Sequence, residues 1–278
     1  MNEPTDQGGK LERITRRWWF FLVFVLLQFT VPPYASKGYE FPDEWSDVAM
    51  QAIGNCINLS YSKAYPGIKP VFKIIPIVLI ISVIIFRNKV ARLFSIYVAI
   101  SYVIFAFGQG IGVTEKYGLA VSTVTLIMFL IVAAFWVWEV VALKNDFNPR
   151  KQPIWKYWVF PLALLAFWYP LNPQTGGPDF KLAYIFGNIA GLAFCTMTPL
   201  YIGLLTLYYP KINIVTLRIT SLVGVSTGIA NMFINFLVNP SIRWWNGVLH
   251  IPLLTISIYG LIISLKRPIL AGDKAVLP

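Results

Sequence analysis

Long runs of apolar residues, separated by short polar turns, are the feature that most restricts how this chain can fold. Eight such runs can be drawn, and they cover residues 18–33, 70–86, 93–113, 118–143, 157–171, 183–209, 219–239 and 247–265. A helix needs about 20 apolar residues to cross a bilayer, and only helices and closed barrels satisfy their own backbone there. The sequence therefore predicts an all-α integral membrane protein, a bundle of about eight transmembrane helices.

Composition supports this class, because 57% of the 278 residues are hydrophobic and only 13% are charged. A soluble domain of this size needs more charge on its surface. We expect one transmembrane domain over residues 18–265, with polar tails at 1–17 and 266–278. Runs one, two and five are short and would need flanking aromatic or basic side chains to reach both surfaces.

Lysine and arginine are distributed unevenly between the two sides that these runs define. Sixteen of the 23 fall on the side of the chain ends: Lys10, Arg13, Arg16, Arg17, Arg87, Lys89, Arg92, Lys144, Arg150, Lys151, Lys156, Lys211, Arg218, Lys266, Arg267 and Lys274. Short cytoplasmic loops are enriched in basic residues. The pattern predicts a multi-pass protein of the plasma or inner membrane with both termini in the cytoplasm. A competing interpretation takes residues 1–31 as a signal peptide, but VPPYAS is a poor cleavage site.

Several functional classes are disfavoured by what the sequence lacks. The net charge of +11 comes from basic residues at the ends of apolar runs, which fits topology better than nucleic-acid binding. His250 is the only histidine, so we expect neither a metal centre nor a bis-histidine haem, and no cofactor. No Walker or HExxH motif is present. Cys56 and Cys195 lie in different environments, and we expect no disulfide between them.

The largest segment outside the apolar runs, residues 34–69, is predicted to lie on the outer side. Within it, FPDEWSDVAMQAIGNCI has the pattern of a short amphipathic helix beginning at Pro42. One face of that helix would carry Trp45, Ala49, Ala52, Ile53 and Ile57. The helix can lie on the membrane and cap the bundle. Alternatively, it can act as a lid over an outward-facing cavity.

Weak sequence similarity between the ends of the first and fifth runs suggests an internal repeat. The segments VLLQFTVPP and ALLAFWYPL, which end the first and fifth runs, align at two leucines, a phenylalanine and a proline. Runs one to four and five to eight could then form a 4+4 parallel repeat. Gly108, Gly110 and Gly112 alternate near the end of the third run, and we expect the helix to stop there.

Uncharged polar residues within the runs share one depth. With the topology above, Gln28, Gln109, Asn188, Asn231, Asn235, Asn239 and His250 all fall in the outer half of the membrane. A polar group left unpaired in hydrocarbon is costly, so we expect these side chains to face one another or water. The sequence predicts an uncharged polar pocket, open to the outer side, with Gln28, Gln109, Asn188, Asn231, Asn235 and His250 as ligand-binding residues.

Helix packing explains the same residues in another way. Asparagine and glutamine often hold transmembrane helices together, and runs six and seven carry small-residue faces with GxxxG spacing. These faces comprise Gly187, Gly191, Cys195 and Thr198 in one run and Ser221, Gly224 and Gly228 in the other. Glu139, the one acid within a run, lies near the inner end and can pair with Lys144.

For function, we expect a permease-like or binding subunit that handles a small uncharged, zwitterionic or lipid-like molecule. Two alternatives stay open. One is a non-catalytic membrane anchor for other membrane subunits of a larger complex. The other is a lipid-modifying enzyme that uses His250 as its base, since histidine exchanges protons near neutral pH. In each case the expected partners are membrane lipids or membrane subunits, and not nucleic acid.

Overall fold

A computed structural model describes residues 5–149, 151–238 and 240–266 of the chain. It is mostly helical. Within these residues, four helical stretches are long and apolar enough to cross a membrane: Ile68–Gly110, Thr123–Ala142, Ile214–Val238 and Arg243–Leu265. A bent helix pair over residues 184–208 makes a fifth if it is one span. Asn239, Arg150, residues 1–4 of the first predicted tail and residues 267–278 of the second, with Arg267 and Lys274, lie outside the described residues.

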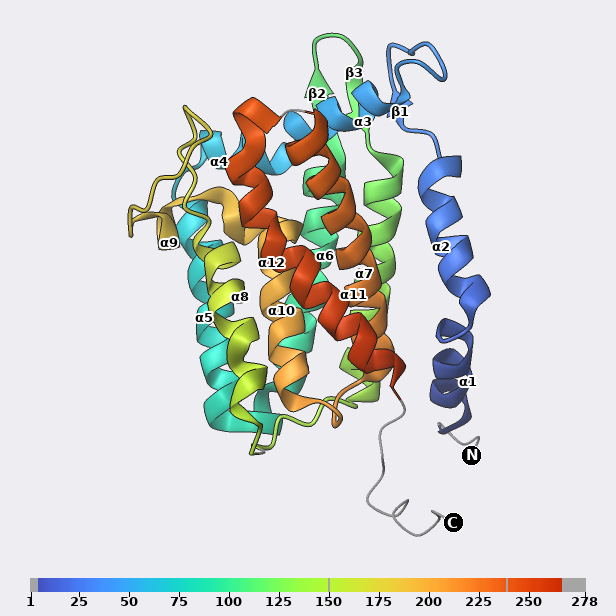
Figure 1. Cartoon of the computed structure of the whole chain (residues 1–278), viewed down its shortest axis with the longest axis vertical. Coiled ribbons are helices and arrows are strands. Elements are labelled where there is room, and N and C mark those ends of the chain that lie inside the picture. Colours follow the sequence, from blue (N-terminus) through green and yellow to red (C-terminus); the bar gives the residue numbers. More distant parts are fainter. Residues whose placement is uncertain (1–4, 150, 239, 267–278) are drawn as a thin grey trace.

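The helices form an elongated bundle (Figure 1). In chain order they are α1 (Thr5–Thr15), α2 (Trp18–Thr30), α3 (Trp45–Gly54), α4 (Ile57–Ala64), α5 (Ile68–Phe86), α6 (Ala91–Gly110), α7 (Thr123–Ala142), α8 (Val159–Trp168), α9 (Tyr184–Gly187), α10 (Phe194–Tyr208), α11 (Ile214–Phe233) and α12 (Pro240–Leu265). Short 3-10 segments are η1 (Arg87–Val90), η2 (Ile154–Trp158) and η3 (Ile189–Leu192), and the π-helical η4 spans Ile234–Val238.

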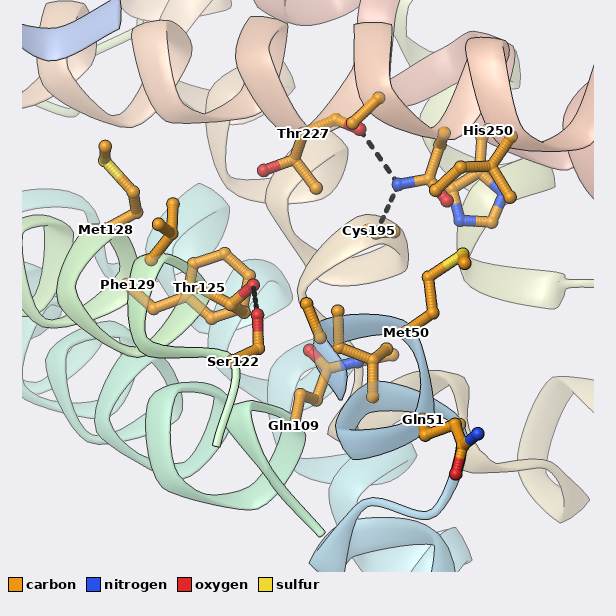
Figure 2. Close-up of a pocket in the computed structure, with 18 of the residues that line it drawn as sticks. Met50, Gln51, Gln109, Ser122, Thr125, Met128, Phe129, Cys195, Thr227 and His250 are labelled. Atoms are coloured by element: carbon orange, nitrogen blue, oxygen red, sulfur yellow. Dashed lines mark hydrogen bonds between the residues drawn. The ribbon is translucent and has the colours of Figure 1, made fainter. Parts of the chain in front are cut away.

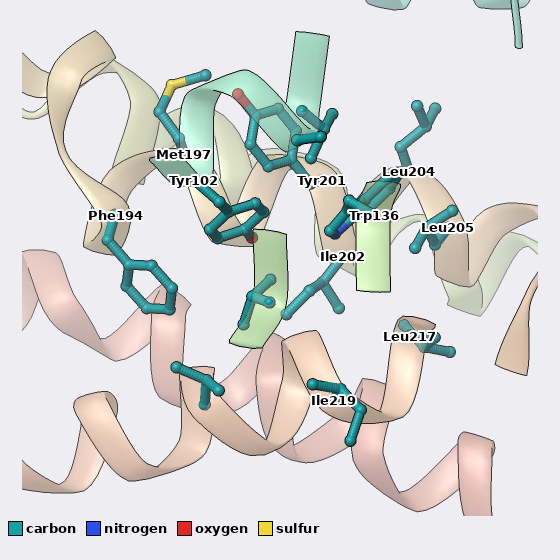
Figure 3. Close-up of a cluster of buried hydrophobic side chains, with 14 of the residues drawn as sticks. Tyr102, Trp136, Phe194, Met197, Tyr201, Ile202, Leu204, Leu205, Leu217 and Ile219 are labelled. Atoms are coloured by element: carbon teal, nitrogen blue, oxygen red, sulfur yellow. The ribbon is translucent and has the colours of Figure 1, made fainter. Parts of the chain in front are cut away.

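Aromatic and aliphatic side chains fill the centre of the bundle between α6, α7, α10 and α11 (Figure 3). The rings of Phe129 and Phe194 stack with their centroids 4.0 Å apart. Some polar groups in this core are paired; for example, Tyr102 shares a 3.0 Å hydrogen bond with Thr198. Trp136 Nε1 likewise donates to Thr220. The core therefore fixes the relative positions of the helices whose outer ends line the site described below.

A small sheet replaces parts of two predicted helices. Residues 111–113 and 118–121, expected at the ends of the third and fourth runs, form strands β2 (Ile111–Thr114) and β3 (Gly118–Val121) of an antiparallel hairpin. Strand β1 (Tyr34–Ala35) pairs with β3. The helix ends at Gly110, as the glycine run predicts. Gly112 allows the close approach of α3, because a Cβ there would lie 2.4 Å from the Ala52 carbonyl oxygen.

The sixth predicted run is not one straight helix. Its two halves, Tyr184–Leu192 and Phe194–Tyr208, meet at 95°. Asn188 caps η3, the segment just before this bend, because its side-chain oxygen accepts from the Ala190 amide at 3.1 Å. Its Nδ2 group donates to the carbonyl oxygens of Trp168 and Tyr169. Asn188 thus joins the start of η3 to the end of α8.

The two ends of the described chain lie at the same end of the bundle (Figure 1). Buried Arg218 of α11 holds them together by donating to Thr15 Oγ1 of α1 at 2.8 Å and to the Ser264 carbonyl oxygen of α12 at 2.5 Å. Arg16 also donates to the Leu265 carbonyl oxygen. Helix α3 and the sheet lie at the opposite end of the bundle.

Candidate functional site

A cavity of about 780 Å³ lies at the end of the bundle covered by α3. Its lining comes from α2, α6, α7, α10, α11 and α12 at the end of the bundle where α3 lies, together with η3, η4 and α3 itself. Figure 2 shows Gln109, Cys195, Met50 and His250 around this space, each from a different helix. Many parts of the chain thus contribute to one site.

Five of the six predicted ligand-binding residues line this cavity: Gln28, Gln109, Asn231, Asn235 and His250. They meet because each lies in the part of its helix nearer the α3 end of the bundle, and antiparallel neighbours bring such parts together. Asn188 is not among the lining residues; its amide is used at the bend between α9 and α10. Its neighbours Ile189 and Ala190 line the cavity instead.

A chain of hydrogen-bonded amides runs along one wall. Asn231 Nδ2 donates to the Thr227 carbonyl oxygen at 2.9 Å, and Asn235 Nδ2 donates to the Asn231 carbonyl oxygen at 2.8 Å. Asn246 Nδ2 then donates to Asn235 Oδ1 at 2.9 Å. The Tyr169 hydroxyl completes the chain by donating to Asn246 Oδ1. This wall joins α11 and η4 to α12 and to the end of α8.

His250 is held in one orientation. Its Nδ1 atom lies 2.7 Å from the carbonyl oxygen of Asn246, one turn earlier in α12. A carbonyl only accepts hydrogen bonds, so Nδ1 carries a proton, and in the neutral ring Nε2 keeps its lone pair. The ring is 6% exposed and its edge faces Tyr169. This arrangement allows Nε2 to accept a hydrogen bond.

Gln109 and Gln28 link the cavity wall to neighbouring helices. Gln109 Oε1 accepts from the Phe194 amide at 2.7 Å, which satisfies a free N–H group at the start of α10. No residue in the described part of the chain bonds to its Nε2 group. Gln28 Oε1 accepts from the Ser226 hydroxyl and so connects α2 to α11. Each side chain retains donors for a bound molecule.

The cavity is not free of charge, which corrects the expectation of an uncharged pocket. Asp47 of α3 and Arg243 of α12 both contribute to its lining. The Tyr117 hydroxyl donates to Asp47 Oδ2 at 2.6 Å and lowers the pKa of this carboxyl group. Arg243 is exposed and forms no hydrogen bond or ion pair with any residue that the structure describes. Arg243 falls between the seventh and eighth predicted runs, and it lies in the first turn of α12.

Helix α3 packs between the cavity and the hairpin. Trp45, Ala49 and Ile53, which belong to the predicted apolar face, line the cavity. Ala52 is buried with Val48 against Tyr117 and Ala120, and Ile57 belongs to the next helix, α4. The helix starts at Trp45 and not at Pro42. Its position beside the cavity favours the lid interpretation over a helix that only rests on the membrane.

The small-residue seam and the amide stripe occupy consecutive parts of α11. A Cβ on Gly224 would lie 2.2 Å from Ser257 Oγ, and one on Gly228 would lie 3.1 Å from the Leu254 Cα atom. The seam therefore packs closely against α12. Beyond it, Asn231 and Asn235 line the cavity. Helix packing thus accounts for the glycines, while these two asparagines border open space.

Sequence reasoning missed several polar residues. Asn246 and Tyr169 belong to the amide chain, and the spacing of four residues between Asn246 and His250 was the signal that they share a helix face. Lys73, which lies in the second predicted run, is fully buried and donates to the Phe167 carbonyl oxygen. Glu139 accepts from the Asn145 amide and from Asn213 Nδ2, whereas Lys144 lies over the Trp138 ring. Both cysteines are free, as expected.

Comparison with known proteins adds no assignment. No protein family, no curated protein and no solved structure matches the chain. The cavity and its side chains therefore carry the functional argument.

Proposed function

We propose that this protein is a multi-pass membrane permease or binding subunit that holds a small uncharged, zwitterionic or lipid-like molecule in the cavity. The observation that supports this most is the convergence of Gln28, Gln109, Asn231, Asn235 and His250 on one space. Drug-sized ligands are typically bound in cavities of about 300–1,000 Å³ with a few directional polar groups. Amides and hydroxyls supply such groups without a fixed net charge.

We also propose that the chain crosses the membrane eight times, through α2, α5, α6, α7, α8, the α9–α10 pair, α11 and α12. The stretch Ile68–Gly110 has 43 residues. As one straight helix it would be about 65 Å long, twice the hydrocarbon thickness. It contains a turn at Arg87, whose φ is 56°. The 4+4 repeat stays a prediction, to be tested by superposing residues 18–143 on 157–265.

The proposed orientation places both termini in the cytoplasm, in a plasma or inner membrane. Support comes from the bonds of Arg218 to α1 and α12, which bring the two ends to one side of the bundle. An even number of crossings requires the same arrangement. Lys211 pairs with Asp146 near this end, at 3.3 Å. The cavity then opens toward the outer side.

The two charged residues that line the cavity, Asp47 and Arg243, restrict the class of ligand that fits it. Asp47 is occupied by Tyr117, and Arg243 has no partner in the described part of the chain. A zwitterion can place its negative group at Arg243 and its positive group near Asp47. A neutral molecule would use the amide wall alone.

Native mass spectrometry of gently extracted protein tests the proposal by revealing co-purified small molecules. The variants Asn235→Leu and His250→Phe should each lose most of the bound species. Asn148→Leu, which removes an exposed loop amide, is the matched control and should retain them. If both cavity variants fold and carry the same bound species as the wild type, the proposal is wrong.

A lipid-modifying enzyme is the second candidate, and the fixed ring of His250 favours it. A general base needs an oriented nitrogen that faces a cavity. The Asn246 carbonyl oxygen supplies the orientation for Nε2. Conversion of a lipid by the purified wild type, lost in His250→Gln, would establish this function. If the purified wild type converts no lipid, catalysis is ruled out and a binding role remains.

A further inference from the structure

A second cavity, of about 340 Å³, adjoins the first beside α2. Gln28 and Phe29 of α2 line it, together with Pro42, Trp45 and Ser46 near the start of α3. Gln28 and Trp45 line both cavities. These two side chains therefore stand between the large cavity and the flank of the bundle at which α2 lies (Figure 1).

Helix α2 has few contacts that hold it to the bundle. Phe24 is its only buried residue. Within the described residues, the bond between Gln28 and Ser226 is the only hydrogen bond from α2 to another membrane helix. Its outward face is apolar and exposed, with Leu26 at 48% and Phe29 at 73%. Such a face suits lipid, and moving α2 outward breaks few interactions.

Helix α3, on the water side, is held more firmly. Lys116 pairs with Glu44 at 2.7 Å, and Tyr117 donates to Asp47 at 2.6 Å. Val48 and Ala52 are fully buried against the hairpin. Displacing this cap would break an ion pair and a charged hydrogen bond and would expose apolar surface. The side of α2 is thus the easier route into the cavity.

We propose that the ligand is a single-chain membrane amphiphile that enters sideways from the bilayer, between the end of α2 and the start of α3. This inference rests on the proposed function of the cavity. The headgroup lies against Asn235, Asn246 and Arg243, and the hydrocarbon chain leaves past Trp45 and Phe29. Both cavity volumes fall within the range of about 300–1,000 Å³ that is typical of binding sites for drug-sized ligands. Such volumes suit a lipid with a single hydrocarbon chain.

The test uses full-length protein in phosphatidylcholine nanodiscs and lysophosphatidylcholine with a photoactivatable group in its chain. Both native cysteines are first replaced (Cys56→Ser and Cys195→Ser). The cysteines introduced by Gln28→Cys and Ser226→Cys are then cross-linked by a short bis-methanethiosulfonate. The matched control bridges Glu44→Cys to Lys116→Cys, which fixes the cap instead. The rate of photolabelling is compared before bridging, after bridging and after reduction.

We expect the bridge between positions 28 and 226 to slow labelling about tenfold, because entry then requires a blocked conformational change. Reduction should restore the rate, and the bridge between 44 and 116 should leave it unchanged. The opposite pattern overturns lateral entry but leaves the cavity function in place. Equal competition by glycerophosphocholine, which lacks the chain, rejects the amphiphile. If unbridged protein gains no label at cavity residues and Asn235→Leu still carries the wild-type bound species, both proposals fail.

Discussion

Two glycines four residues apart, Gly187 and Gly191, have different surroundings although the sequence pattern treats them alike. A Cβ on Gly191 would lie 2.5 Å from the Phe72 carbonyl oxygen, whereas one on Gly187 would meet nothing within 4 Å. Backbone cannot move aside as a flexible side chain can. We expect Gly191→Ala to lower the free energy of unfolding by about 1–3 kcal/mol, as overpacking does.

Gly187→Ala is the matched control and should leave this free energy unchanged or slightly raised. Thermal unfolding in detergent, followed by the loss of monodisperse protein, measures both variants. Equal midpoints for the two would mean that α5 and η3 do not approach as closely as described.

At the same scale, position along the apolar runs was enough to predict that several amides meet at one cavity. Gln28, Gln109, Asn231 and Asn235 were found because each amide lies near the outer end of its run. Asn188 lies at the same depth but serves a bend, and a sequence read as one straight helix contains no signal for that bend. Arg243 and Asp47 were missed as lining residues because both were assigned to segments outside the bundle.

Among the elements, the cap α3 should respond to acid. The hydrogen bond from Tyr117 lowers the pKa of Asp47. A carboxyl group whose pKa is lower in the folded state stabilises the fold at pH values above its pKa in the unfolded chain, which is about 3.9. This stabilisation is lost as the pH falls through the pKa of the folded state. We expect the attachment of α3 to weaken below about pH 4.

Fluorine NMR of a trifluoroethylthio label on Ser46→Cys, in the cysteine-free background, reports this attachment. Asp47→Asn should show a loosened signal at neutral pH and a smaller change in acid than the parent, because only the Glu44–Lys116 pair is then left to titrate. Asp43→Asn, at an exposed neighbour, should behave as the parent does. A signal from the parent that is constant from pH 7 to pH 3 would contradict the prediction.

Helix α1 depends on Arg218 for its position. The guanidinium group donates to the Glu12 carbonyl oxygen, to Thr15 Oγ1 and to the Ser264 carbonyl oxygen. The compact ammonium group of a lysine cannot donate to all three of these acceptors as the planar guanidinium group does. We expect Arg218→Lys to weaken the docking of α1 by about 1.5–3 kcal/mol, the range for hydrogen bonds to charged groups.

Trypsin cleavage at Arg13 measures this docking. It should be fastest in Arg218→Lys and intermediate in Thr15→Val, which removes one acceptor. Cleavage at the wild-type rate in both variants would show that α1 is held by other contacts.

For the whole molecule, the arrangement of the helices predicts which loops share a side of the membrane. In the cysteine-free background, the substitutions Lys89→Cys and Asn148→Cys should each react with an impermeant maleimide applied to the side of the membrane on which Lys10 lies. The substitutions Ser36→Cys, Glu115→Cys and Thr175→Cys should react with maleimide applied to the opposite side of the membrane. Labelling of intact and of opened cells distinguishes the two sides. If Lys89 and Thr175 were labelled from the same side, the eight-crossing arrangement would be wrong.

The membrane class and the stopping point of α6 could be predicted from sequence, because apolar run length and glycine placement act locally. The hairpin, the bend after Leu192 and the helix at Arg243 could not. Residues 118–121 are apolar enough to continue a helix, and only pairing with residues 34–35 and 111–114 makes them a strand. Such pairing depends on residues far apart in the chain.

Lys73 has a consequence for the order in which the protein assembles. Its ammonium group is buried against the carbonyl oxygen and the ring of Phe167, which follows it by 94 residues. During synthesis α5 therefore reaches the bilayer long before its partner exists, and an unpaired ammonium there is costly. Until α8 arrives, we expect the lysine to remain at the hydrated surface. We therefore expect the final depth of α5 to depend on a helix made later, so that ribosome-bound chains cut short before residue 159 hold α5 shallower than complete ones.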